Sequence, residues 1–348
     1  MVVDCHVHTR DLEERAKETI DHALRVARRA GVSGIFAMPN TKPPLTHRDI
    51  VQEYLRIARD ANVPDVFFGA YMALTADVEQ VKHAVETYRE LRPHVVGFKL
   101  YAGHSTNNIG VIQEDDQRAV FRTLAQEGYD GVLAIHAEKE NHINTSVFDL
   151  KRPETHAFAR PPLAEIESVE DMIFFADDAS YQGKLHIAHI STPEAVKRVG
   201  LALREGMDIS SGVTPHHLFF DYRLMRGPEG ALYKMNPPLR FPNAAAEMRS
   251  LLQQGAIDWI ETDHAPHTLG EKRSESCPSG IPALHAWPLF IEALGREGLT
   301  GAEIIRYTHT NVVNRFGVDL HLERQGVYMP DAYKVAVWRP LEELVCAA

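Results

Sequence analysis

The chain has 348 residues, of which 44% are apolar and 24% charged, a composition that indicates a globular protein rather than a disordered one. Its formal net charge of −11 argues against a nucleic-acid or anionic membrane surface, because such partners require clustered Lys and Arg. No apolar run is long enough to cross a bilayer, and the three cysteines form neither a paired framework nor a C-x-x-C motif, so we expect a cytoplasmic protein with free thiols.

Short β-rich runs alternate with amphipathic stretches along the whole chain. The β-rich runs cover residues 2–8, 34–38, 66–71, 95–101, 132–137, 185–191, 207–213 and 259–263. Amphipathic stretches such as 14–30 and 49–61 lie between them. Eight such units predict an α/β fold, a (β/α)8 TIM barrel formed by residues 1–348 as a single domain. In this fold catalytic groups lie at the carboxyl ends of the strands, so polar residues there are the candidates for a site.

The first run ends in two histidines, His6 and His8. Because side chains alternate along a strand, residues two apart point to the same side, and both imidazoles are expected to face the barrel interior as a metal-binding pair. For the pair alone, two partly buried histidines that only form hydrogen bonds are an equally open alternative.

Lys99 lies in the fourth run, VVGFKLY, where the strand is otherwise apolar. Burial of an unpaired ammonium is costly, so something must compensate it. One solution is the addition of carbon dioxide to the neutral amine, which gives a carbamate that can bridge two cations. For a single lysine taken alone, an ion pair or a side chain that extends to solvent is the more frequent case.

His136 and His189 follow apolar residues of the fifth and sixth runs, and neutral imidazole is a good ligand for zinc and related metals. Each alone could also be a hydrogen-bonded core histidine. His186 lies three residues before His189, so it is expected on the opposite side of the strand, in a packing or supporting role.

Asp263 ends the eighth run, in WIETDHAPH. A carboxylate here can bind a metal through one oxygen and take a proton with the other, as attack of bound water on an amide requires, so Asp263 is the candidate general base. An aspartate that caps the following loop or helix is an equally frequent case. Of the histidines that follow, His267 is a candidate substrate contact, and His264 is expected to be structural.

Together these residues resemble the amidohydrolase superfamily with a carboxylated-lysine binuclear centre. The matching residues, in order along the strand ends, are His6, His8, Lys99, His136, His189 and Asp263. Within the superfamily, the segments HVHTRD, AMPNT, GFKLYAGHST, KMNPPLR and DHAPH resemble the dihydroorotase family, over nearly the whole chain. The resemblance implies reversible hydrolysis of L-dihydroorotate to N-carbamoyl-L-aspartate, a step of pyrimidine synthesis.

The resemblance also implies roles for individual residues. Two zinc ions would be bridged by carboxylated Lys99, with the first held by His6, His8 and Asp263 and the second by His136 and His189. The implied substrate-binding residues are Arg10, Asn40, His267 and Asn236, although Asn236 could equally only shape its Pro-Pro loop. Arg10 and Asn40 are the most informative, because a guanidinium suits a substrate carboxylate and related hydantoinases lack that arginine.

Two other polar features are less decisive. Ser105 and Thr106 lie in the glycine-bounded segment 103–110, which could be a lid over the substrate or only a solvated turn. Arg160 and Glu165, in ARPPLAE, are expected to form a structural pair.

Many members of the superfamily carry a small β-sandwich beside the barrel. Here only residues 325–338 could supply part of it, so we expect a barrel with little or no accessory β-sandwich. The resemblance implies a small anionic substrate and a homodimer, and we expect no nucleic-acid or membrane partner.

Two alternative functions stay open. Another cyclic-amide hydrolase, of the hydantoinase or allantoinase type, would share the metals but not the carboxylate-binding pair Arg10 and Asn40. A catalytically silent scaffold for a partner enzyme such as aspartate transcarbamoylase would usually have lost metal ligands, whereas all six candidates are present here.

Overall fold

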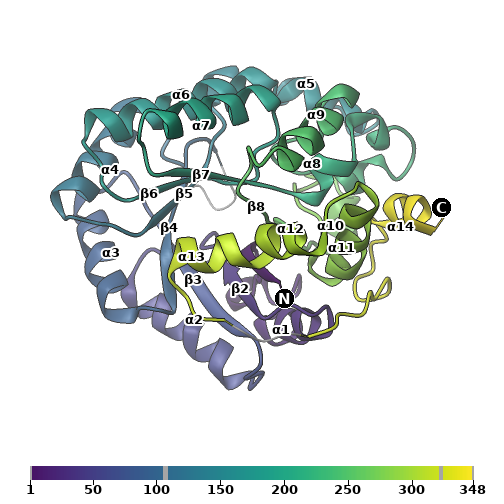
Figure 1. The fold of residues 1–348 in the computed structure, drawn as a ribbon, viewed down its shortest axis with the longest axis horizontal. Coiled ribbons are helices and arrows are strands. Elements are labelled where there is room, and N and C mark those ends of the chain that lie inside the picture. Colours follow the sequence, from purple (N-terminus) through teal and green to yellow (C-terminus); the bar gives the residue numbers. More distant parts are fainter. Residues whose placement is uncertain (1, 105–108, 321–323, 347–348) are drawn as a thin grey trace.

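Eight parallel strands form one sheet in the order β1 to β8 in the computed structural model, which describes residues 2–104, 109–320 and 324–346 (Figure 1). The strands are β1 (Val3–Val7), β2 (Gly34–Ala37), β3 (Phe67–Ala73), β4 (Val95–Tyr101), β5 (Val132–His136), β6 (Lys184–Ile187), β7 (Ile209–Val213) and β8 (Trp259–Ile260). Each strand pairs with the next in parallel, and in the pairing of β4 with β5 Lys99 lies opposite Ala134. The predicted barrel fold is confirmed.

Helices lie outside the ring of strands (Figure 1). They are α1 (Ile20–Arg29), α2 (Arg48–Asp60), α3 (Val78–Leu91), α4 (Glu114–Gln126), α5 (His156–Ala159), α6 (Pro162–Asp178), α7 (Pro193–Arg204), α8 (Pro215–Phe219), α9 (Pro242–Gln253), α10 (Leu269–Lys272), α11 (Trp287–Arg296), α12 (Gly301–Ile305), α13 (Asn311–Phe316) and α14 (Arg339–Cys346). In α1, Thr19 caps the first turn by accepting a hydrogen bond from the His22 N–H, and Ile20, Leu24 and Ala27 form a buried stripe. In the parts of the chain that the structure describes, no helix is long and apolar enough to cross a membrane.

One end of the barrel interior is filled with apolar side chains. Val3, Phe36 and Trp259 from the strands pack in one cluster with Val312 and Phe316 of α13. Because this cluster fills the barrel at the amino ends of the strands, the carboxyl ends form the open end. All the candidate ligands are at that end or just below it.

The edges β1 and β8 are joined mainly by side chains. The backbone contributes an isolated bridge between Val7 and His264. Asp4 accepts hydrogen bonds from the N–H and Oγ1 of Thr262, at 3.1 and 2.6 Å, and from Trp287 Nε1 at 2.9 Å. We call this junction of β1 and β8 the seam, and it connects residues from opposite ends of the barrel sequence.

Two strands end three or more residues earlier than predicted. β6 ends at Ile187 and β8 at Ile260, so His189 and Asp263 lie in the turns that follow rather than at the strand ends. Both residues have positive φ angles, 40° and 49°, which residues other than glycine rarely adopt. A left-handed backbone conformation at these positions persists only where contacts with the surrounding structure stabilise it.

The segment 325–338 contains no strand, and the described residues form a single sheet, so the expectation of little or no accessory β-sandwich is confirmed. Side-chain hydrogen bonds connect the segment to the barrel instead. Trp338 Nε1 donates to the Pro282 carbonyl at 2.7 Å, and the Tyr333 hydroxyl donates to the Glu18 carboxylate.

Candidate metal centre

The first donor group, His6, His8 and Asp263, comes from the two sides of the seam. His6 and His8 direct their Nε2 atoms at the same oxygen, Asp263 Oδ1, at 3.4 and 2.9 Å. The donor atoms of the three buried side chains lie within 4.8 Å of one another. Strand alternation predicted that His6 and His8 would share a side, and they do. Two imidazole nitrogens and a carboxylate oxygen at this separation can bind a divalent metal ion.

The second donor group consists of His136, the last residue of β5, and His189. Nδ1 of His136 and Nε2 of His189 lie 3.1 Å apart. The His189 ring is also close to the first donor group, with its centroid 4.9 Å from that of the His6 ring. The structure therefore brings the predicted histidines together in one cluster.

Lys99 is fully buried in β4, and its Nζ has no hydrogen-bond partner among the described residues. Burial lowers the pKa of its amine to about 8, although the Glu261 and Asp263 carboxylates oppose the shift. The alternatives of an ion pair or of solvent contact are not what the structure shows. An ammonium here is poorly compensated, so burial makes the neutral amine, from which a carbamate can form, more accessible than in an exposed lysine.

The protonation states of the donors suit a metal. Burial, followed by the charge of Lys99, lowers the pKa of His6 to about 4, and burial also lowers the pKa of His8. Burial raises the pKa of Asp263, but the His8 hydrogen bond and both histidine rings outweigh it and hold that pKa well below its usual value. Neutral imidazoles and an ionised carboxylate are the forms that bind metal, so these residues fit a divalent cation.

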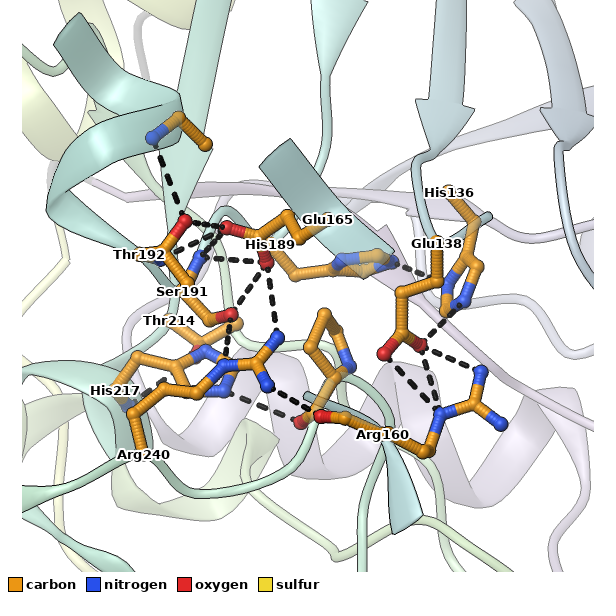
Figure 2. Close-up of polar contacts among 12 residues, drawn as sticks. His136, Glu138, Arg160, Glu165, His189, Ser191, Thr192, Thr214, His217 and Arg240 are labelled. Atoms are coloured by element: carbon orange, nitrogen blue, oxygen red, sulfur yellow. Dashed lines mark hydrogen bonds and ion pairs between the residues drawn. The ribbon is translucent and has the colours of Figure 1, made fainter. Parts of the chain in front are cut away.

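A further set of contacts orients the histidine rings. His8 Nδ1 donates to Asn40 Oδ1 at 2.6 Å, so Nε2 is the nitrogen that faces Asp263 and the site where a metal would bind. His136 Nε2 donates to Glu138 at 3.0 Å, and Arg160 in turn donates to both Glu138 oxygens at 2.6 to 3.1 Å (Figure 2). Each ring thus presents its other nitrogen to the centre of the cluster.

The predicted pairing of Arg160 with Glu165 is wrong. Glu165 accepts hydrogen bonds from the backbone N–H and the hydroxyl of both Ser191 and Thr192, in the turn that follows His189 (Figure 2). Its cationic neighbour is Arg240, at 3.5 Å, which also donates to Ser191 Oγ at 2.9 Å and to the Arg160 carbonyl at 2.7 Å. The prediction failed because Arg160 pairs with Glu138 instead. Glu138 lies too far from Arg160 along the chain for a local pattern to indicate this pair.

His186 does not lie on the side of β6 that alternation predicted. Its Nε2 is 3.2 Å from Glu261 Oε2 and its ring stacks on Trp259, so it also faces the barrel interior. The expectation failed because β6 ends at Ile187, after which alternation no longer relates His186 to His189. Its expected supporting role agrees with these contacts.

The pocket above the cluster contains most of the predicted substrate-binding residues. Its lining residues are His6, His8, Arg10, Asn40, Tyr101, His104, His136, His189, Asn236, Asp263, Ala265, Pro278, Ser279 and Gly280. His267 is buried just behind Arg10, with its Nε2 3.1 Å from Arg10 Nη2. Asn236 Oδ1 is already in contact with His156 Nε2, at 2.9 Å, and with Ser279 Oγ, at 3.1 Å.

The remaining predictions divide into two kinds. Ser105 and Thr106 lie outside the described residues. His264 has the structural surroundings expected of it: Nε2 donates to Glu18 at 2.9 Å, and Nδ1 accepts from the backbone N–H of Ala283 and Leu284.

Sequence reasoning missed four residues at or beside the cluster: Glu138, Glu261, Tyr101 and His104. Two of them had a readable signal. Glu261 lies two residues before Asp263 in an apolar run, and Glu138 lies two residues after His136, so each was a charge at the spacing that returns to the interior face. Tyr101 and His104 carried no such signal.

The chain is similar to curated dihydroorotases. It is 32% identical to the dihydroorotase of Methanosarcina mazei over 333 residues, which cover 91% of this chain and 70% of that protein. Among solved structures its fold is similar to that of an L-hydantoinase from Arthrobacter aurescens, with a TM-score of 0.79 and 22% identity over 91% of this chain and 70% of that one. A Saccharomyces cerevisiae dihydroorotase in complex with 5-fluoroorotic acid has a TM-score of 0.74 and 21% identity, over 92% of this chain and 84% of that one. No family model matches the chain.

Proposed function

The chain belongs to the dihydroorotase family, and we propose that its histidine cluster is a metal centre that reversibly hydrolyses L-dihydroorotate to N-carbamoyl-L-aspartate in pyrimidine synthesis. One observation carries the proposal: metal-binding donors and the guanidinium of Arg10 line the same pocket. The donors would act on the ring amide. Arg10 would bind the carboxylate that distinguishes dihydroorotate from neutral cyclic amides.

We propose two zinc ions, one held by each donor group, with carboxylated Lys99 shared between them. The buried Nζ of Lys99, which has no hydrogen-bond partner among the described residues, supports this assignment. Addition of carbon dioxide to the neutral amine would form an N–C bond, break one C–O π bond and release one N–H proton, giving an anionic carbamate. Starting from the ammonium, two protons would leave and a positive charge would be replaced by a negative one. Bound zinc would supply polarisation of the substrate carbonyl and activation of water near neutral pH.

Asp263 is the proton-transfer group in this proposal. Its carboxylate is ionised in the resting site, because the His8 hydrogen bond and the two rings outweigh the effect of burial on its pKa. It would take the proton of the attacking water and pass it to the ring nitrogen as the C–N bond breaks. A base fixed within hydrogen-bond distance contributes roughly 10²- to 10⁴-fold to such a step.

Arg10 is held in place for an anion. Its Nε donates to the Pro266 carbonyl at 3.2 Å, which fixes the plane of the guanidinium, and no carboxylate forms an ion pair with it among the described residues. Burial, followed by the charge of Arg10, lowers the pKa of His267, so that ring is neutral beside the guanidinium. The positive charge is therefore available to the substrate carboxylate.

The proposed function is tested by substrate choice. We expect the purified, zinc-loaded chain to convert L-dihydroorotate and N-carbamoyl-L-aspartate into one another, with kcat/KM at least about 100-fold above that for hydantoin or allantoin. Turnover of hydantoin or allantoin without dihydroorotate would contradict the substrate assignment. Full activity without bound metal would contradict the metal centre. Sedimentation of the same sample tests the homodimer that we include in the proposal.

A further inference from the structure

Glu261 places a carboxylate inside the barrel, between the apolar cluster and the two donor groups. The residue is 1% exposed and follows β8 directly. Its Oε2 accepts hydrogen bonds from Cys5 Sγ at 3.3 Å, His186 Nε2 at 3.2 Å and Trp259 Nε1 at 3.0 Å. Three donors from three strands thus anchor one oxygen.

The other oxygen faces the donor groups. Glu261 Oε1 accepts a hydrogen bond from the backbone N–H of His189 at 2.6 Å, and it lies 3.4 Å from Nδ1 of His6. One oxygen therefore contacts one histidine from each donor group. The His189 contact falls on a residue whose φ is positive, where the turn needs an outside partner.

The barrel is shaped to admit this carboxylate. A Cβ atom at Gly212, on the neighbouring strand β7, would lie 2.7 Å from Glu261 Cδ and Oε2. Glycine at this position leaves the space that the carboxylate fills. An apolar side chain would fill the same layer without burying a charge, so packing alone does not account for Glu261.

We propose that Glu261 is a positioning residue for the metal centre. Its charge, 3.4 Å from Nδ1 of His6, favours the tautomer in which Nδ1 carries the proton and Nε2 the lone pair, and by holding the His189 backbone it aims that ring at His136. The anchors on Oε2 keep the carboxylate from following either histidine. This inference rests on the metal centre of the proposed function and assigns it a supporting residue that does not itself contact the substrate.

The test is the zinc affinity of Glu261→Gln in the full chain, measured by competition with a chelator. We expect affinity to fall roughly 10- to 100-fold, while the circular dichroism of the metal-free variant matches that of the wild type. Asp258→Asn is the matched control. Asp258 also lies beside β8 and accepts a hydrogen bond, from the Ser211 N–H at 2.8 Å, but touches neither donor group, so its zinc affinity should stay within twofold of wild type.

A folded Glu261→Gln with wild-type zinc affinity would overturn the inference while leaving the metal centre intact. A wild-type chain that binds no zinc would overturn the metal centre itself. Should the variant not fold, the zinc-loaded wild type still gives an answer through the ¹⁵N resonances of its histidines. We expect a proton on Nδ1 of His6, and an unprotonated Nδ1 would refute the role of Glu261.

Discussion

Asp263 depends on its backbone for its place in the site. The side chain belongs to the turn after β8, yet its Oδ1 reaches His6 and His8 across the seam because the residue adopts a positive φ. A residue with these contacts can bind a cation and move a proton from the same position. We therefore expect that its side chain can be removed with loss of activity but without loss of the fold.

Replacement of Asp263 by Ala is expected to lower kcat for dihydroorotate by at least about 10³-fold, because the residue that we propose as both metal ligand and general base is lost. The far-ultraviolet circular dichroism should match that of the wild type. The matched control is Asp130→Ala at an exposed position, which should keep full activity. Retained hydrolysis by the Asp263 variant would refute the assigned role.

Arg10 can be tested independently of the metals. In Arg10→Met we expect kcat/KM for dihydroorotate to fall by about 10²- to 10³-fold, because a charged partner of the carboxylate is lost, with an unchanged zinc content. Hydrolysis of a neutral cyclic amide, where it is detectable, should change less than about threefold. An equal loss for both substrates would mean that Arg10 supports the site generally. The exposed Arg29→Met serves as the control.

At the scale of single residues, the sequence predicts what strand geometry controls. His6 and His8 share a strand, and their common direction followed from alternation alone. His186 and His189 do not share one, because β6 ends between them, and the same rule failed. Glu261 was not predicted because the search of this run for metal ligands selected Asp263. The neighbouring sequence also does not show which donors will surround a buried carboxylate.

The loops after β7 and β8 form one unit through Lys272, the last residue of α10. Its Nζ donates to the carbonyls of Lys234, Pro278 and Gly280, each at 3.0 Å, and the side chain is buried with no carboxylate partner among the described residues. Two of these acceptors flank Ser279, which lines the pocket. The ammonium thus holds the wall of the substrate pocket from behind.

Lys272→Met should loosen that wall. We expect KM for dihydroorotate to rise roughly tenfold, because the pocket residues lose their fixed positions, while kcat and zinc affinity change less than about threefold. Loss of the three hydrogen bonds from Nζ should also lower the free energy of unfolding by about 1 to 3 kcal/mol. Lys82→Met, at a partly exposed site on α3, is the control. An unaltered KM would show that the loop keeps its shape without the lysine.

At the scale of elements, the order of strands and helices was predictable and several ends were not. The predicted helix 14–30 begins only at Ile20, because Thr19 provides the cap and residues 12–14 form a separate short turn. The strands before His189 and Asp263 end early because the ladder stops where a turn must bring a side chain inward. The hydrophobic periodicity of a sequence can continue beyond the end of a helix or strand. The actual end is set by capping residues and turns.

Across the whole molecule, Glu18 connects three distant parts of the chain. Its carboxylate accepts hydrogen bonds from His22 of α1, His264 beside the seam and Tyr333 of the C-terminal segment. Burial raises the pKa of this carboxyl, but the His264 charge and the three hydrogen bonds outweigh it and lower the pKa to about 2. Below the usual pKa of a glutamate, the folded state therefore binds fewer protons here than the unfolded state does.

The stability that Glu18 contributes should be fully present above pH 4.5 and lost as the pH falls towards 2. We expect the difference in free energy of unfolding between wild type and Glu18→Gln to shrink by roughly 2 kcal/mol from pH 7 to pH 3, measured by urea unfolding. The exposed Glu275→Gln should show no such change. A difference that is constant with pH would contradict the depressed pKa.

The barrel as a whole could be predicted because eight alternating units leave few other folds. Its closure could not. The seam depends on Asp4, Thr262 and Trp287, and the filling of the amino end depends on α13, all of which join residues that no local pattern relates. The candidate ligands were predicted as a set only because the fold puts strand ends together, and their supporting residues became visible only in three dimensions.

The seam also has a consequence for the biosynthesis of the protein. Asp4 and Thr262 lie 258 residues apart, and His8 and Asp263 lie 255 apart. At the usual speed of translation, roughly 10 to 50 s separate the appearance of the histidine pair on the ribosome from that of its carboxylate partner. A nascent chain in that interval has an open sheet edge and an incomplete set of ligands. Binding of a metal at the proposed centre and closure of the barrel would thus be late, linked events, and we expect a chain released before residue 263 to be catalytically inert however well its first strands had folded.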